Sequence, residues 1–259
     1  MKKRGSVMAI LAWIVSPLAA DAATQNIPPS LYQVDGKPVP SSCLAGLSRD
    51  GDQDKVDLTH CGDPSVKPKT QPDGMVGYDD PKGGYFYYRY LGKADGLDVL
   101  YMEYSGGGTG HFTALIGITR NGQTLAPKHV YAGGDRCNGG LSDAALANGR
   151  LTFNQAITPY DLIALGDPGS KPEAYKDLEA SASSCIGQSH MVGDDKHWTG
   201  VALDDDGRTD QKGWTEQYRY QSCFNMLYRE TFAQHRTELD RDGVKAFAAS
   251  FAKRCMQPK

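Results

Sequence analysis

The sequence predicts an α+β fold, in which an antiparallel β-meander is followed by a disulfide-linked helical hairpin that packs on it. Segments rich in aromatic and β-branched residues recur between residues 85 and 157, and turn residues separate them. Helical periodicity dominates the C-terminal part of the chain. Six cysteines provide covalent links between these parts.

The expected meander consists of extended segments joined by tight turns. Apolar residues alternate along Phe112–Thr119, which ends near Asn121-Gly122, the strongest short signal for a β-hairpin. Pro127 in the next segment indicates an edge strand or a bulge, because proline cannot donate to a β-ladder. The strands expected from these patterns are Tyr85–Tyr90, Leu97–Tyr104, Phe112–Thr119, Gln123–Tyr131 and Leu151–Ile157.

The residues after the meander favour helices. Thr158 is the expected N-cap of a short helix over Asp161–Leu165, because its hydroxyl can accept from a free amide of the first turn. Glu173–Ala182 has a helical composition, whereas Trp198–Leu203 is expected to be a further strand.

Two helices are expected at the C-terminal end. The first spans Trp214–Arg236, and the second carries apolar residues at intervals of three and four as far as Cys255. A turn near Leu239–Gly243 separates them, and Asp242 is the expected N-cap of the second helix.

The cysteine positions suggest one pairing scheme. Cys223 and Cys255 are about equally distant from the turn of the helical hairpin, so equal helix rise brings their sulfur atoms together at its open end. Proximity in the chain favours a second bridge. The expected disulfides are Cys43–Cys61, Cys137–Cys185 and Cys223–Cys255, and the second of these would tie the sheet to the helical half.

The N-terminus has the pattern of a secretory signal peptide over residues 1–22. A basic patch that includes Arg4 precedes the apolar run Val7–Ala20, and Ala20-Asp21-Ala22 offers small residues where a signal peptidase cuts. We therefore expect a periplasmic or secreted protein. The chain contains no Asn-x-Ser/Thr site, which favours a bacterial origin.

The rest of the chain divides by composition into parts that we expect to form one globular domain. Residues 23–83 are polar and rich in turn formers, which predicts an irregular segment held by a disulfide. Residues 84–157 form the expected meander, and residues 158–259 the mainly helical region.

Charge and hydropathy restrict the partners. The formal net charge is −3, which argues against a nucleic-acid partner, because such a partner favours a basic face. No apolar run long enough to cross a membrane follows residue 22, so the exported chain is expected to have no integral membrane segment.

The first glycine-rich stretch, residues 104–112 (YSGGGTGHF), invites comparison with a phosphate-binding loop. Such a loop precedes a helix, whereas here a strand and a hairpin turn follow. Ser105 and His111 could approach each other, but nucleophilic catalysis also needs an orienting carboxylate. The stretch is therefore expected to be a connection between antiparallel strands.

A second glycine-rich stretch, residues 132–140 (AGGDRCNGG), is expected at the same end of the sheet. Its glycines allow another backbone to approach closely, and a disulfide at Cys137 would hold it in place. Alternatively, Asp135 and Arg136 pair with each other and serve only the local structure. The candidate binding residues are Ser105, Thr109, His111, Asp135, Arg136 and Asn138.

Alternating carboxylates between residues 50 and 57 suggest a calcium site, because oxygen ligands can converge on a hard cation. Lys55 stands where an EF-hand loop has glycine, so the alternative is a solvated acidic loop. The candidate calcium ligands are Asp50, Asp52, Asp54 and Asp57. His190 and His197, which flank two aspartates, are a weaker zinc candidate.

These observations favour an exported binding or inhibitor-type protein without catalytic activity over an enzyme. Its expected partner is a protein or a cell-envelope component, recognised through the glycine-rich stretches, and no cofactor other than calcium is suggested. The alternative is a cell-envelope hydrolase with dispersed acidic residues, for which Glu103 is the first acid to consider.

Overall fold

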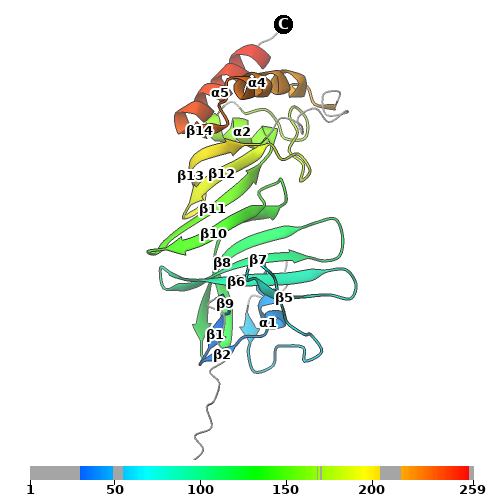
Figure 1. Ribbon diagram of the computed structural model, residues 1–259, viewed down its shortest axis with the longest axis vertical. Coiled ribbons are helices and arrows are strands. Elements are labelled where there is room, and N and C mark those ends of the chain that lie inside the picture. Colours follow the sequence, from blue (N-terminus) through cyan, green and yellow to red (C-terminus); the bar gives the residue numbers. More distant parts are fainter. Residues whose placement is uncertain (1–29, 49–54, 168, 170, 205–216, 257–259) are drawn as a thin grey trace, which may run out of the picture.

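The computed structural model describes residues 30–48, 55–167, 169, 171–204 and 217–256. It confirms the α+β class with antiparallel sheets. The molecule is elongated: the N-terminal segment with helix α1 lies at one end, two larger sheets follow, and the C-terminal helices lie at the other end (Figure 1).

The larger sheet has the strand order β3-β9-β8-β7-β6-β5-β4, and β6 to β9 are the first four strands of the expected meander. The strands β4 and β5 extend the meander into the segment that was expected to be irregular, whereas the expected fifth strand, Leu151–Ile157, lies in the second sheet. Asn121 and Thr124 pair across the β8–β9 turn, where Gly122 has φ +60°. A register shift falls at Pro127, as its residue type predicts. The strands are β3 (Val56–Asp57), β4 (Lys69–Thr70), β5 (Val76–Asp79), β6 (Tyr85–Ala94), β7 (Leu97–Ser105), β8 (Phe112–Asn121) and β9 (Thr124–Asp135).

Both faces of this sheet are buried. Tyr88, Met102 and Ile116 face the N-terminal segment, which holds β1 (Gln33–Val34), β2 (Lys37–Pro38) and α1 (Ser41–Ala45). The alternate positions, among them Tyr101 and Leu115, face the second sheet. Because side chains alternate along each strand, the sheet contributes to two separate apolar cores, one on each face.

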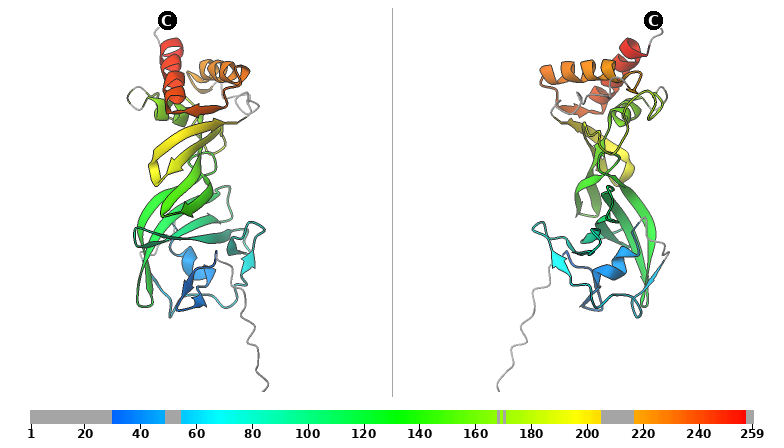
Figure 2. Two further views of the ribbon diagram at one scale, coloured as in Figure 1. Left: turned by 60° about the vertical axis from the view of Figure 1, so that its left-hand side comes forward. Right: turned by 90° about the vertical axis from the view of Figure 1, so that its right-hand side faces the viewer.

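The second sheet has the order β10-β11-β12-β13-β14, and the helices lie at its end away from the larger sheet (Figure 2). Its residues and those of the helices form one apolar cluster, in which Val201 contributes from β13 and Phe224 from α4. The elements are β10 (Leu141–Ala147), β11 (Arg150–Ile157), β12 (Gly187–Val192), β13 (Asp194–Leu203), β14 (Glu238–Asp240), α2 (Pro159–Gly166), α4 (Gln221–Ala233) and α5 (Arg241–Cys255).

This arrangement differs from the expectation for residues 158–259, which contribute three strands as well as helices. The helical hairpin packs on the second sheet, and the meander has the second sheet between itself and the helices (Figure 1). Similarly, β10 and β11 belong to the second sheet although they follow the meander directly in the sequence.

Thr158 caps α2 as its residue type predicts. Its Oγ1 accepts from Asp161 N at 3.3 Å, and the Asp161 carboxylate accepts in return from Thr158 N at 2.9 Å. This reciprocal pair is a capping box, and Pro159 follows at the first helical position.

The helix expected over Glu173–Ala182 does not form. Tyr175 has φ +60°, and Ala174 and Leu178 make an isolated bridge instead. Glu179 is buried, its N–H donates to Gln221 of α4, and its carboxylate accepts from the N–H of Ser181. Tertiary hydrogen bonds thus replace those of a helix.

The helix α5 begins two residues earlier than expected. Asp240, and not Asp242, is the N-cap, since its Oδ1 accepts from Gly243 N at 2.8 Å. The residues before it pair with β13 as β14, which fixes the point at which the chain leaves the sheet.

All three expected disulfides are present, with Cα–Cα distances of 5.3, 4.6 and 5.7 Å for Cys43–Cys61, Cys137–Cys185 and Cys223–Cys255. The second joins the end of β9 to the start of β12, so it ties the two sheets together and not the meander to the helices. Among the described residues, no helix is long and apolar enough to cross a membrane.

The buried tyrosines of β6 predict a loss of stability in alkali. Burial raises the pKa of Tyr87, Tyr88 and Tyr90 from 10.0 to about 12, and in Tyr87 and Tyr90 a neighbouring aspartate adds to the effect. The folded state thus holds these protons more tightly than the unfolded state, so their contribution to stability is complete below pH 10 and is lost between pH 10 and 12.

Parallel titrations of phenolate absorbance and circular dichroism check this prediction. We expect exposed tyrosines to ionise near pH 10, and the remaining ones to ionise together with loss of the β-sheet signal nearer pH 12. Ionisation of every tyrosine near pH 10 with an unchanged sheet signal would contradict it.

Candidate functional site

Two glycine-rich loops meet at one end of the larger sheet, as the sequence predicts. The first glycine loop (residues 104–112) joins β7 to β8, and the second glycine loop (residues 132–140) joins β9 to β10. His111 N donates to Asp135 Oδ1 at 3.0 Å, and Arg136 N donates to His111 O at 3.3 Å. The backbones of the loops are therefore bonded to each other.

Within the first glycine loop, Ser105 has a local role. It is buried, its Oγ donates to Gly110 O at 2.7 Å and accepts from Gly107 N at 3.3 Å. The hydroxyl thus closes the loop instead of pointing outward. Thr109 and His111 are exposed, and His111 Nδ1 lies 3.0 Å from the hydroxyl of Tyr85.

The second glycine loop is held by its own residues. Arg136 has φ +46°, and its guanidinium contacts Asp135 through Nε at 3.0 Å and Nη2 at 3.2 Å. Partial burial of Asp135 raises its pKa, but hydrogen bonds from Arg136 and from His111 N outweigh this and hold the pKa below its usual value. The pairing that the sequence offered as the alternative is therefore present.

Asn138 completes the turn of the second glycine loop. Its N–H donates to Asp135 O at 2.9 Å, and its carbonyl accepts from Asp135 N at 3.0 Å. Its side-chain amide points to Tyr175, whose hydroxyl lies 3.5 Å from Nδ2. Tyr175 is 58% exposed, so an aromatic ring is accessible beside the loop.

Close approaches of backbone explain the glycines of the second loop. A Cβ at Gly140 would lie 2.2 Å from Arg136 O, and one at Gly134 would lie 2.4 Å from Asn138 O. Both distances are far below van der Waals contact. By contrast, a Cβ at Gly108 in the first loop would meet nothing within 4 Å.

A cavity of about 320 Å³ lies beside the two loops, between the sheets. Its wall combines residues of β6, β7, β8, β10, β11 and β12 with residues of both glycine loops. These residues include a carboxylate, an imidazole, a guanidinium and an amide. The polar residues that carry these groups and the tyrosine beside them are Glu103, His111, Arg136, Gln188 and Tyr85.

Glu103 and Tyr85 both line this cavity. The hydroxyl of Tyr101 lies 2.7 Å from Glu103 Oε1 and 3.0 Å from Leu141 O, which fixes the carboxylate against the second sheet. Burial raises the pKa of Tyr85, and the negative charges of Glu103 and Asp135 raise it further. The Tyr85 hydroxyl therefore holds its proton more tightly than a free tyrosine, and it lies 3.0 Å from His111 Nδ1.

Sequence reasoning missed Tyr175 and Gln188. Tyr175 falls in the segment expected to be helical, and Gln188 lies on a strand whose partner sheet was not foreseen. Local patterns carry no signal for either, because both reach the loops through tertiary packing. The exposed left-handed backbone of Tyr175 is visible only in the structure.

Of the four candidate calcium ligands, the structure describes only Asp57. Asp50, Asp52 and Asp54 lie outside the described residues, and Asp57 accepts from Thr59 N and Thr59 Oγ1 at 2.9 and 2.7 Å. Hydrogen bonds from Thr59 and His60 lower the pKa of Asp57 to about 2. In the described ranges, no group of three or more His, Cys, Asp or Glu is placed to hold a metal ion.

The two histidines of the zinc candidate have separate partners. His190 Nδ1 lies 2.8 Å from Asn154 Oδ1, whereas His197 Nδ1 lies 2.6 Å from Asp194 Oδ1. Each imidazole is thus engaged in its own pair.

Comparison of the chain with protein-family models, with curated proteins and with solved structures found no match. The functional argument therefore rests on the glycine loops and the cavity beside them.

The glycine loops predict a contrast between two alanine substitutions. Gly140→Ala forces a Cβ against Arg136 O, so we expect the free energy of unfolding to fall by about 1–3 kcal/mol. Gly108→Ala is the matched control and should change it by less than about 0.5 kcal/mol. Urea unfolding of the three proteins measures both values, and equal stability of the two variants would contradict the tight loop.

Proposed function

We propose that the protein is an exported, disulfide-stabilised binding protein of the inhibitor type, which recognises a protein or a cell-envelope component through the two glycine loops. One observation carries this proposal: the loops are bonded to each other and present exposed Thr109, His111 and Arg136 at one end of the larger sheet, with exposed Tyr175 beside Asn138. Loops fixed on a rigid scaffold are common sites of recognition.

Preorganisation supports binding as the role of this surface. The Asp135–Arg136 pair, the turn at Asn138 and the disulfide of Cys137 restrict the second glycine loop before any partner arrives. A partner then loses less conformational freedom on association than it would with a mobile loop. Tyrosine and arginine are also the side chains that most often dominate the energy of an interface.

The disulfides support export. Three bridges persist only where the surroundings are oxidising, as in the periplasm or outside the cell. The leader expected over residues 1–22 agrees with this location, although it lies outside the described residues.

A charge-neutral double substitution tests the binding surface. Asp135→Asn with Arg136→Gln removes the ion pair and both charges while it keeps side chains of similar size. We expect the immobilised protein to retain at least about tenfold less of its partner from an envelope extract, because charge-assisted contacts at a hot spot are worth that much.

The matched control is another arginine–aspartate pair, in which Arg120 Nη2 and Asp35 Oδ2 lie 2.6 Å apart near the β8–β9 turn. Asp35→Asn with Arg120→Gln should leave partner retention unchanged. If the glycine-loop variant and this control retain the partner equally well, the glycine loops are not the binding surface.

The alternative, a cell-envelope hydrolase, is favoured by one feature of the cavity. Glu103 and the Tyr85–His111 pair face the same space, and paired acids or an acid with a hydrogen-bonded imidazole can serve proton transfer. Under this alternative, Glu103→Gln abolishes hydrolysis of an envelope polymer. Under the binding proposal, no hydrolysis depends on Glu103, and turbidity or sugar-release assays with purified envelope polymers separate the two.

A further inference from the structure

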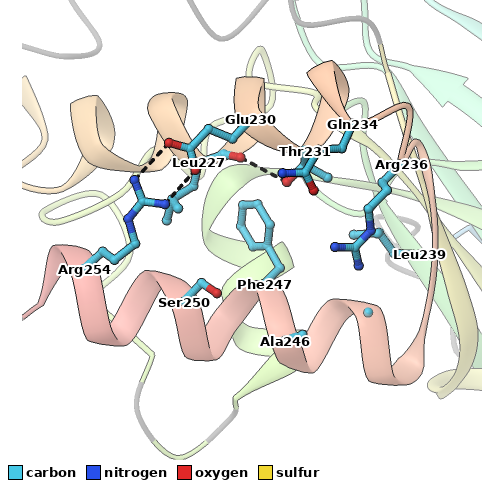
Figure 3. Close-up of a pocket in the computed structure, with 11 residues that line it drawn as sticks. Leu227, Glu230, Thr231, Gln234, Arg236, Leu239, Ala246, Phe247, Ser250 and Arg254 are labelled. Carbon is cyan, nitrogen blue, oxygen red and sulfur yellow. Dashed lines mark hydrogen bonds and ion pairs between the residues drawn. The ribbon is translucent and has the colours of Figure 1, made fainter.

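A second cavity lies between helices α4 and α5, at the opposite end of the molecule from the N-terminal segment (Figures 1 and 3). The disulfide Cys223–Cys255 joins the two helices at one end, and residues 234–240 join them at the other. Between these two links the helices leave a cavity of about 240 Å³.

One wall of this cavity is apolar. Leu227 of α4, Leu239 of β14 and Phe247 of α5 line it, and each belongs to the large core cluster with only 4–7% of its surface exposed. In Figure 3 the ring of Phe247 stands in the middle of the cavity, between the two helices. Because so little of each side chain is exposed, the wall offers a small apolar contact for part of one aliphatic or aromatic group.

The charged residues that line the cavity carry more positive than negative charge. Glu230 and Arg254 neutralise each other through two contacts of 2.6 and 2.9 Å. Arg236 is exposed and enters from the other side with its guanidinium directed toward Phe247, and it has no hydrogen-bond or ion-pair partner among the residues drawn in Figure 3.

The acidic residues next to Arg236 in the chain are engaged elsewhere. Glu238 lies 3.6 Å from His190 Nε2, and Asp240 accepts from Gly243 N as the N-cap of α5. The lining therefore carries one positive charge that the neighbouring carboxylates leave without a direct partner.

We propose that this cavity binds a carboxylate carried next to an apolar side chain, as in a hydrophobic amino acid or the C-terminal residue of a peptide. The planar guanidinium of Arg236 presents parallel N–H groups that match a carboxylate. The apolar side chain of the ligand packs on Leu227, Leu239 and Phe247, and the Ser250 hydroxyl on α5 offers a further hydrogen bond.

The size of the cavity agrees with a ligand of this kind. Its volume of about 240 Å³ lies below the roughly 300–1,000 Å³ typical of sites for drug-sized molecules, so it fits a small ligand or one terminal residue. None of its lining residues belongs to the glycine loops, so this inference stands or falls independently of the proposed function.

A pair of ligands that differ only in charge tests the proposal. Isothermal titration of the disulfide-bonded protein with N-acetyl-L-leucine is expected to give saturable binding. N-acetyl-L-leucinamide lacks the carboxylate and should bind at least about tenfold more weakly. Equal binding of the two, or no binding of the acid at millimolar concentration, would overturn the proposal.

Two variants and one control locate the site. Arg236→Gln should weaken N-acetyl-L-leucine at least about tenfold, whereas Lys253→Gln, an equal change of charge on the exposed side of α5, should not. Ser250→Leu fills the cavity from a surface position and should abolish binding while thermal unfolding stays within a few degrees of the parent. Binding that survives Arg236→Gln and Ser250→Leu would place the ligand elsewhere and contradict the inference.

Two further ligands distinguish a free amino acid from a peptide C-terminus as the source of the carboxylate. Tighter binding of free L-leucine than of N-acetyl-Ala-Ala-Leu assigns the cavity to an amino acid. The reverse order assigns it to the C-terminus of a peptide. Failure of both ligands would overturn the proposal together with its ligand class.

Discussion

The structure depends on one constraint: its larger sheet is buried on both faces. Tyr88 and Met102 point to one side of the sheet and Tyr101 and Leu115 to the other, and all four are at most 4% exposed. A sheet of this kind needs a cover on each face, because uncovered apolar faces would be exposed to water. The N-terminal segment covers one face, and the second sheet covers the other.

Each cover carries its own disulfide. Cys43–Cys61 closes the N-terminal segment, which contains only one short helix and short strands, and Cys137–Cys185 fastens the second sheet to the first. Cys223–Cys255 then joins α4 and α5, which pack on the second sheet at its end away from the larger sheet (Figure 1).

The same constraint places the candidate binding surface. The chain must leave the larger sheet after β9 and enter the second sheet at β10, and the second glycine loop makes this crossing. The close backbone approaches at Gly134 and Gly140 and the left-handed Arg136 are consequences of the sharp change of direction. The crossing brings polar groups of both sheets, Glu103 and Gln188, to one cavity. The inferred recognition surface thus arises at the joint between the two layers.

The sequence predicts those features that local chemistry determines. Asn121-Gly122 identifies a hairpin because Gly122 readily adopts the positive φ of that turn, and Thr158 identifies a helix start because its hydroxyl satisfies a free amide. The disulfide pairing followed from equal arm lengths and from proximity. The meeting of the two glycine loops was predictable as well. One loop precedes β8 and the other follows β9, so both lie at the same end of the β8–β9 hairpin.

Features that depend on distant partners were not predictable. The segment Glu173–Ala182 has residues that suit a helix, but Glu179 bonds to Gln221, which lies far away in the chain. The strand β14 is only three residues long and is stabilised by pairing with β13, so no local periodicity marks it. Arg136 also illustrates the limit: the sequence allowed both an outward and a paired guanidinium, and only the geometry of the turn decides for the pair.

Native mass spectrometry of the protein, recovered from its producing organism without reductants or chelators, tests the central claim most directly. The account predicts a chain with three disulfides and a stoichiometric partner mass, which is lost when the Asp135–Arg136 pair is neutralised. A chain that carries no partner, or that carries the same partner after this change, would contradict a recognition role for the glycine loops.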